Sequence, residues 1–216
     1  MQIKCFVNNA FQENSYVLID EQSHQCVLID PGMSNDQEWQ TMLGFLDDER
    51  LTPVAVWLTH CHIDHEMGTG YLTEHYDGLA ISGPVDDYAC LPAPGMQAQL
   101  FGIPCQKEVT PVTHNIKEGD VLHLASTEVR VFDIPGHSHH GLCYYVPEAS
   151  VLFTGDVLFC GSIGRSDFGP AMGCDGEALV DGIRCKLLAL PPQTHVCPGH
   201  GPMTTIASEV EHNPYF

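Results

Sequence analysis

The stretch Thr59-His60-Cys61-His62-Ile63-Asp64-His65 places three imidazoles and a carboxylate within six residues, directly after an apolar run. Imidazole and carboxylate groups are the ligands of Zn²⁺ and neighbouring first-row metals. Side chains two residues apart in extended backbone point to the same side, so His60 and His62 can share one ion. Because a helix is expected to begin near Asp64 or His65, these two side chains project differently and can serve a second ion.

Further His and Asp residues follow other predicted strand ends. His137 lies in Pro-Gly-His-Ser, Asp156 in Thr-Gly-Asp and His200 in Pro-Gly-His-Gly. The glycines allow sharp turns and close backbone approach next to each of these residues. Loops that follow strands bring their side chains together if the strands all run toward one edge. Together with the first cluster, these positions predict a metal centre rather than seven unrelated polar residues.

The chain around these positions predicts short strands and a few amphipathic helices. Strands are expected at 15–20, 26–30, 54–58, 121–124, 128–134, 142–146, 151–154 and 194–197. Helices are expected after a capping box at Ser34 and Gln37, with an apolar stripe of Trp39, Met42, Leu43 and Leu46, and over 175–189 and 206–212. Residues 84–105 predict no clear element. Strands and helices do not strictly alternate, so the sheets are expected to be mixed and covered by helices.

The composition limits the possible partners. Of 216 residues 44% are hydrophobic, and 28 acidic side chains against 8 basic ones leave a formal charge of −20. This charge repels phosphate backbones and anionic lipid, so neither nucleic acid nor a membrane is an expected partner. Ten cysteines without a Cys-x-x-Cys pair, and an N-terminus unlike a signal peptide, predict reduced thiols in a cytoplasmic protein. One domain over residues 1–216 is expected.

The order of these motifs resembles that of the metallo-β-lactamase fold family. His-x-His-x-Asp-His at 60–65 is followed by Gly-His at 136–137, Gly-Asp at 155–156 and Gly-His-Gly at 199–201, and Asp30 matches a further position. Residues 161–168 and the ending resemble the short glyoxalase II-like, or hydroxyacylglutathione hydrolase-like, enzymes. The resemblance covers the whole chain and implies an α+β fold. This fold is an αβ/βα sandwich of two mixed β-sheets flanked by helices, with the site at one edge.

The resemblance also implies a ligand set for two ions. The first ion would be held by His60, His62 and His137, the second by Asp64, His65 and His200, with Asp156 bridging the two and Asp30 supporting the site from beneath. Asp64 is expected both to bind metal and to orient the attacking hydroxide. The Asp at position 156 distinguishes the chain from lactamases that use Cys there, and His62 distinguishes it from diiron flavoproteins that carry Glu.

These assignments predict a metal-dependent hydrolase. Two divalent ions, Zn²⁺ by default and Fe or Mn as alternatives, would supply a metal-bridging hydroxide at neutral pH. No Gly-x-Ser-x-Gly nucleophile motif is present. The resemblance implies a small acyl thioester of the hydroxyacylglutathione type as substrate, and a thiol of pKa ~8.5 suits this site because it leaves without strong acid assistance. The alternatives are a mononuclear non-haem iron persulfide dioxygenase and a non-catalytic metal-binding protein. The sequence predicts no oligomeric state.

Several residues near the motifs have more than one possible role. The chain has sixteen residues after His200, so the basic C-terminal region of long glyoxalase II enzymes is not expected. His139 and His140 are either polar groups at the pocket rim or, as favoured here, solvent-facing loop residues. Arg165 either reaches a substrate carboxylate or, as favoured here, pairs with Asp167. Cys61 is expected to be buried packing, and Tyr144 and Tyr145 to point one inward and one outward.

Overall fold

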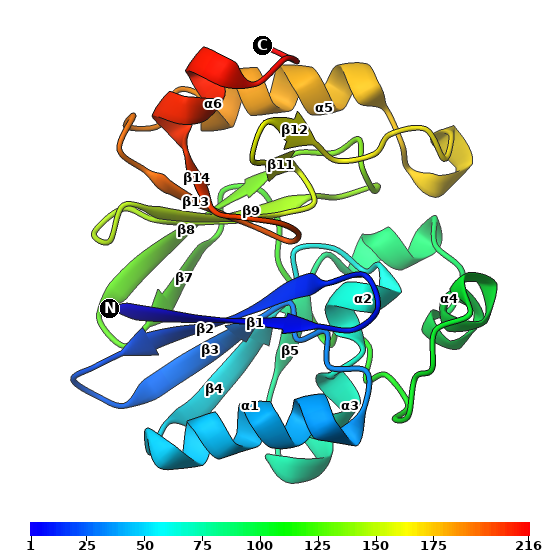
Figure 1. The fold of residues 1–216 in the computed structure, drawn as a ribbon, viewed down its shortest axis with the longest axis vertical. Coiled ribbons are helices and arrows are strands. Elements are labelled where there is room, and N and C mark those ends of the chain that lie inside the picture. The colour runs from blue at the N-terminus through cyan, green and yellow to red at the C-terminus, as the bar shows by residue number, and fades with distance from the viewer. The chain divides into compact units, whose positions relative to one another are not determined.

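A six-stranded mixed sheet forms the centre of the first half of the chain in the computed structural model, which describes residues 1–216 (Figure 1). The chain divides into two units, Met1–Asn115 and Ile116–Phe216. In the first, the strands in sheet order are β1 Gln2–Asn8, β2 Glu13–Asp20, β3 Gln25–Ile29, β4 Thr52–Trp57, β5 Ile81–Gly83 and β6 His114–Asn115. Strands β1 to β3 pair antiparallel, and β3 to β6 pair parallel. The expectation of a single domain stays a prediction.

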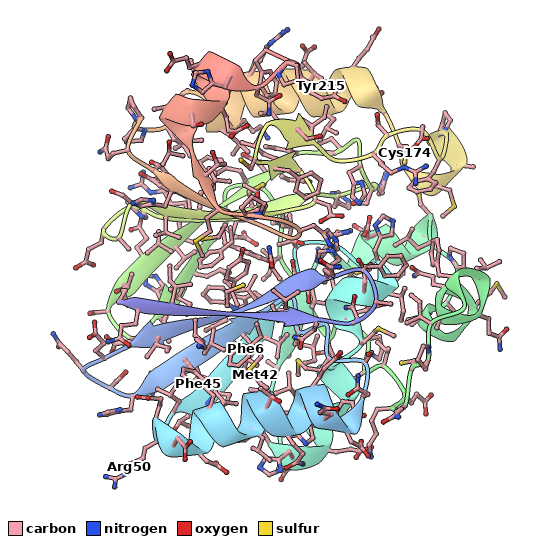
Figure 2. All side chains as sticks on the ribbon, in the orientation of Figure 1. Phe6, Met42, Phe45, Arg50, Cys174 and Tyr215 are labelled. Atoms are coloured by element: carbon pink, nitrogen blue, oxygen red, sulfur yellow. The ribbon has the colours of Figure 1, made fainter.

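The helices of this unit are α1 Asp36–Asp48, α2 Ile63–Glu66, α3 Thr69–His75 and α4 Pro94–Phe101, with a 3-10 helix at Val85–Ala89. The predicted apolar stripe of α1 is confirmed for Trp39, Met42 and Leu46, which are buried, and Leu43 is half-buried. Phe6 of β1 packs edge-on against Phe45 of α1 with ring centroids 5.4 Å apart (Figure 2). Amphipathic spacing therefore fixes which face of α1 meets the sheet.

The predicted capping box of α1 is wrong by one residue. Asn35 is the N-cap, and its side chain accepts hydrogen bonds from the backbone N–H groups of Gln37 and Glu38. Ser34 instead donates its hydroxyl to the Glu38 carboxylate at 3.1 Å. Asparagine and serine cap helices about equally well, so the choice between adjacent residues depends on the path of the incoming chain.

The second unit is built on another six-stranded mixed sheet. Its strands in sheet order are β14 Thr204–Thr205, β13 His195–Pro198, β10 Val151–Gly155, β9 Leu142–Val146, β8 Thr127–Asp133 and β7 Val121–Leu124. Strands β10 and β13 are parallel and the other neighbours antiparallel, so β8, β10 and β13 all run in one direction. A small hairpin, β11 Leu158–Phe159 and β12 Ser162–Ile163, follows β10. The carboxyl ends of β8, β10 and β13 therefore share one edge.

Helices α5 Gly176–Gly182 and α6 Ile206–His212 lie over one face of the second sheet (Figure 1). A 3-10 helix at Pro170–Met172 precedes α5, and a π-helical turn at Ile183–Leu187 follows it, so the helix expected over 175–189 is shorter and changes pitch. Its predicted apolar face is confirmed, since Leu179, Ile183 and Leu187 are fully buried. Two mixed sheets flanked by helices confirm the predicted α+β class. No helix is both long and apolar enough to cross a membrane.

Tyr144 and Tyr145 differ from the expectation that one of them points outward. Tyr144 is 0% and Tyr145 5% exposed, because β9 is an interior strand and buried along its whole length. Tyr145 packs among the apolar residues beneath α5, in one cluster with Leu179 and Ile183. Alternation along a strand separates two faces, and only burial decides whether the second face meets water.

Candidate functional site

The four predicted ligands of the first unit lie on the segment that leaves the carboxyl end of β4. Residues 59–62 continue without a strand partner, and α2 begins at Ile63. The ring centroids of His60 and His62 are 4.7 Å apart, and those of His60 and His65 are 4.2 Å apart. His60 and His62 each offer a ligand atom within 4.8 Å of the other's, as two-residue spacing in extended backbone predicts.

Asp30 supports this segment from the end of β3 and is only 2% exposed. Its Oδ1 accepts the Thr59 N–H at 2.7 Å, and its Oδ2 accepts the Thr59 hydroxyl at 2.7 Å and lies 3.0 Å from His65 Nδ1. The carboxylate only accepts, so the His65 proton belongs on Nδ1 and the lone pair on Nε2. That Nε2 lies 3.6 Å from Asp64 Oδ2.

The same network orients His60. The Thr59 hydroxyl gives its single proton to Asp30, so toward His60 Nδ1, at 3.0 Å, it can only accept. This assigns the His60 proton to Nδ1 and leaves the Nε2 lone pair for a ligand bond. One buried carboxylate therefore sets the tautomer of two imidazoles in the arrangement that metal-binding histidines use.

The three predicted ligands of the second unit lie at the carboxyl ends of β8, β10 and β13. Asp156 Oδ2 lies 3.5 Å from His137 Nε2, and Asp156 Oδ1 lies 3.5 Å from His200 Nε2. His137 Nδ1 lies 2.8 Å from the Arg165 carbonyl oxygen, which can only accept, so the His137 lone pair is on Nε2. Each oxygen of one carboxylate thus faces a different imidazole.

These spacings suit a divalent cation. With metal bonds of about 2.0–2.2 Å, two ligands of a tetrahedral ion are separated by about 3.4 Å. The 3.5 Å and 3.6 Å separations lie close to this length and beyond an ordinary N–H···O hydrogen bond. The donor set of imidazole and carboxylate therefore fits a first-row divalent metal in each unit. The joining of the two ligand sets into one centre stays a prediction.

Two glycines permit the close backbone approach around the second ligand set. Gly136, just before His137, has φ of +129°, and a Cβ there would lie 2.3 Å from the Asp175 carbonyl oxygen. A Cβ on Gly164 would lie 1.9 Å from the carbonyl oxygen of Asp156. Side chains at these positions would displace the backbone that carries the ligands.

The residues with open interpretations have structural partners. Arg165 binds both carboxylate oxygens of Asp167 at 2.9 and 3.0 Å, in the surface pairing favoured from the sequence. His140 is half-buried and its Nδ1 lies 2.6 Å from Asp133 Oδ2, so the solvent-facing prediction describes only His139, which is exposed. Cys61 is fully buried, and this burial raises the pKa of its thiol, in agreement with a packing role.

Two buried carboxyls near the ligand segment were missed from the sequence. Glu13 of β2 is 0% exposed; its Oε2 accepts the Ser15 hydroxyl at 2.7 Å, and its Oε1 has no hydrogen-bond partner. Burial raises the pKa of Glu13 well above its ordinary value, with His65 opposing and Asp30 adding to the shift. Glu66 accepts the Tyr88 hydroxyl at 2.7 Å, and burial raises its pKa to about 8. The one sequence signal for a buried Glu13 was its position as a charged residue beside the apolar residues of β2.

The raised pKa of Glu13 predicts a pH-dependent stability in the metal-free chain. The folded state keeps a proton that the unfolded chain releases above about pH 4.5, so the free energy of unfolding should fall as pH rises above that value. Glu13→Gln removes this titrating group. The free energy of unfolding should then fall less steeply with pH, by up to ~1.4 kcal/mol per pH unit. Urea unfolding between pH 5 and 8 measures it, with the exposed Glu49→Gln as control. Equal slopes for Glu13→Gln and wild type would contradict a protonated Glu13.

A family model and a curated relative both match nearly the whole chain. The family model described as the metallo-beta-lactamase superfamily matches residues 8–209. The hydroxyacylglutathione hydrolase GloC of Haemophilus influenzae is 33% identical over 220 residues, covering 100% of this chain and 98% of the relative. Both matches extend over both units.

Solved structures agree with these matches. The crystal structure of the BLEG-1 B3 metallo-beta-lactamase has a TM-score of 0.86 and 33% identity over 99% of each chain. The crystal structure of TTHA1623 in a di-iron-bound form has a TM-score of 0.82 and 34% identity over 99% of this chain and 100% of that one. The fold is thus found in solved proteins that this chain matches over nearly the whole length of both.

Proposed function

The chain belongs to the metallo-beta-lactamase superfamily, and from that premise we propose that it is a binuclear metal-dependent hydrolase of small acyl thioesters of the hydroxyacylglutathione type. The observation that carries the proposal is the carboxylate of Asp156, whose two oxygens face two different imidazoles at 3.5 Å. One carboxylate shared between two imidazoles suits a pair of cations better than a single ion.

We assign the ligands of the pair as the motif order implies. His60, His62 and His137 would hold one ion, Asp64, His65 and His200 the other, and Asp156 would bridge them. The fixed Nδ1 protons of His60, His65 and His137 support this assignment, because each leaves Nε2 as the ligand atom. Zn²⁺ is the default ion; iron remains an alternative, since the similar protein TTHA1623 has a di-iron-bound form.

When bound, the two ions would lower the pKa of a bound water toward ~7 and polarise the substrate carbonyl. The chain's own contribution is orientation. Asp64 has a side chain 14% exposed, and its Oδ2 lies 3.6 Å from His65 Nε2. Its second oxygen is the group that would accept the proton of the attacking water and hold it in line with the carbonyl.

A thioester suits this set of residues because a thiol of pKa ~8.5 departs without a strong general acid. Metal binding would occupy the imidazoles and carboxylates that could otherwise serve as a general acid. The formal charge of −20 repels an anionic substrate, so the cations would have to provide its attraction. Binding is therefore expected to be weak.

The test is the reaction itself under argon. We expect thiol release from S-D-lactoylglutathione without oxygen, at a rate that rises through about pH 7. Metal-reconstituted protein is assayed in parallel for oxygen uptake with glutathione persulfide and for cleavage of a cephalosporin. Oxygen uptake without anaerobic thiol release would replace the proposal with the iron dioxygenase. Cephalosporin cleavage alone would replace it with a lactamase, and metal binding with no turnover would leave a non-catalytic metal protein.

A further inference from the structure

The ligand segment after β4 lacks a neighbouring strand, and side chains occupy its backbone amides instead. The N–H of Thr59 donates to Asp30 Oδ1 at 2.7 Å, that of Cys61 to Asp87 Oδ2 at 2.8 Å, and that of Ile63 to Gln97 Oε1 at 3.1 Å. These side chains therefore satisfy alternate backbone amides of a segment that has no strand partner. The proposed ligands His60 and His62 are the residues between them.

Gln97 binds the ligand segment through both the oxygen and the nitrogen of its side-chain amide. Its Oε1 accepts the Ile63 N–H, and its Nε2 donates to the Cys61 carbonyl at 3.2 Å and to the Pro92 carbonyl at 2.9 Å. One amide therefore binds the backbone on both sides of His62. Gln97 is 2% exposed, so these hydrogen bonds do not compete with bulk water.

The helix that carries Gln97 is mostly exposed. Gln97 and Ala98 are the buried residues of α4, whereas Met96, Leu100 and Phe101 are 55–69% exposed. Ala98 packs in a small apolar cluster with Ile63 and Met67 of the α2 region. The inward face of α4 thus consists of one small apolar contact and one amide directed at the ligand segment.

We propose that Gln97 is a positioning residue that holds the backbone on either side of His62 and so sets the direction of the His62 imidazole before a metal binds. The inference rests on the proposed function, because it takes His60 and His62 as ligands. A backbone fixed in advance need not be ordered by the ion, and loss of such outer contacts typically weakens metal binding 10–100-fold.

The experiment measures Zn²⁺ affinity by competition with a chromophoric chelator and follows the Co²⁺ absorption spectrum of the same proteins. Gln97→Met keeps the length of the side chain but removes all three hydrogen bonds, and should weaken Zn²⁺ binding about tenfold or more. Gln97→Glu keeps an acceptor for the Ile63 N–H and should lose less. Gln99→Met makes the same change at an exposed position of the same helix and should bind like wild type.

Urea unfolding of each metal-free protein separates positioning from folding. The proposal expects folded Gln97→Met with weaker Zn²⁺ binding and an altered Co²⁺ spectrum. Wild-type affinity and an unchanged spectrum in Gln97→Met would overturn the inference while leaving the proposed function intact. If Gln97→Met does not fold, Gln97→Glu decides by the same two readouts. A wild-type chain that binds no Zn²⁺ would contradict the proposed function and the inference together.

Discussion

Replacing Asp156 with asparagine is expected to remove both metal ions and to lower thioester hydrolysis about a thousandfold or more. Its Oδ2 faces His137 and its Oδ1 faces His200, each at 3.5 Å. Asparagine has one oxygen and no charge, and its NH₂ group would point at one of the two imidazoles. Losing about 4 kcal/mol of transition-state stabilisation corresponds to three powers of ten in rate. Elemental analysis after reconstitution and anaerobic thiol release measure the two effects.

Two further variants make the Asp156 result specific. Asp181→Asn, on the exposed side of α5, should keep native metal content and rate. His200→Ala should mainly empty one of the two sites, because only one oxygen of Asp156 faces it. Native metal content and native rate in Asp156→Asn would show that the bridge is assigned to the wrong residue.

Asp30→Asn is expected to weaken metal binding about 10–100-fold and to lower the free energy of unfolding of the metal-free chain by about 1–3 kcal/mol. The carboxylate of Asp30 accepts from Thr59 twice and from His65 Nδ1 once. The oxygen of the asparagine amide would have to accept the Thr59 N–H, so its NH₂ group would face His65. His65 Nδ1 could then form a hydrogen bond only as the acceptor. The His65 proton would then move to Nε2 and block the proposed ligand atom.

Chelator competition and urea unfolding measure the two effects of Asp30→Asn. The exposed Asp48→Asn in α1 serves as the control and should change neither. Metal affinity in Asp30→Asn equal to that of wild type would mean that the tautomer of His65 is set by something other than Asp30, and that the network acts only on stability.

Local patterns predicted much of the fold because the chain's local preferences agree with its final structure. The helix predicted at 206–212 is found with the same bounds, and every predicted strand overlaps an observed one. Strand β1, Gln2–Asn8, was missed, and only its last residue, Asn8, is fully buried. Residues 84–105 predicted no element, and so the role of Gln97 in α4 had no signal in the sequence.

What the sequence by itself determined is the chemistry: which imidazoles and carboxylates follow strand ends, and in which order. Ligand type and spacing are local properties of the chain, and so they can be read without coordinates. Tertiary structure alone decided which nitrogen of each imidazole carries the proton, because that depends on Asp30, Thr59 and the Arg165 carbonyl. It also decided that Gln97 holds the backbone beside His62. Hydrogen bonds between residues some 30 apart in sequence leave no periodic trace, so only the folded chain reveals them.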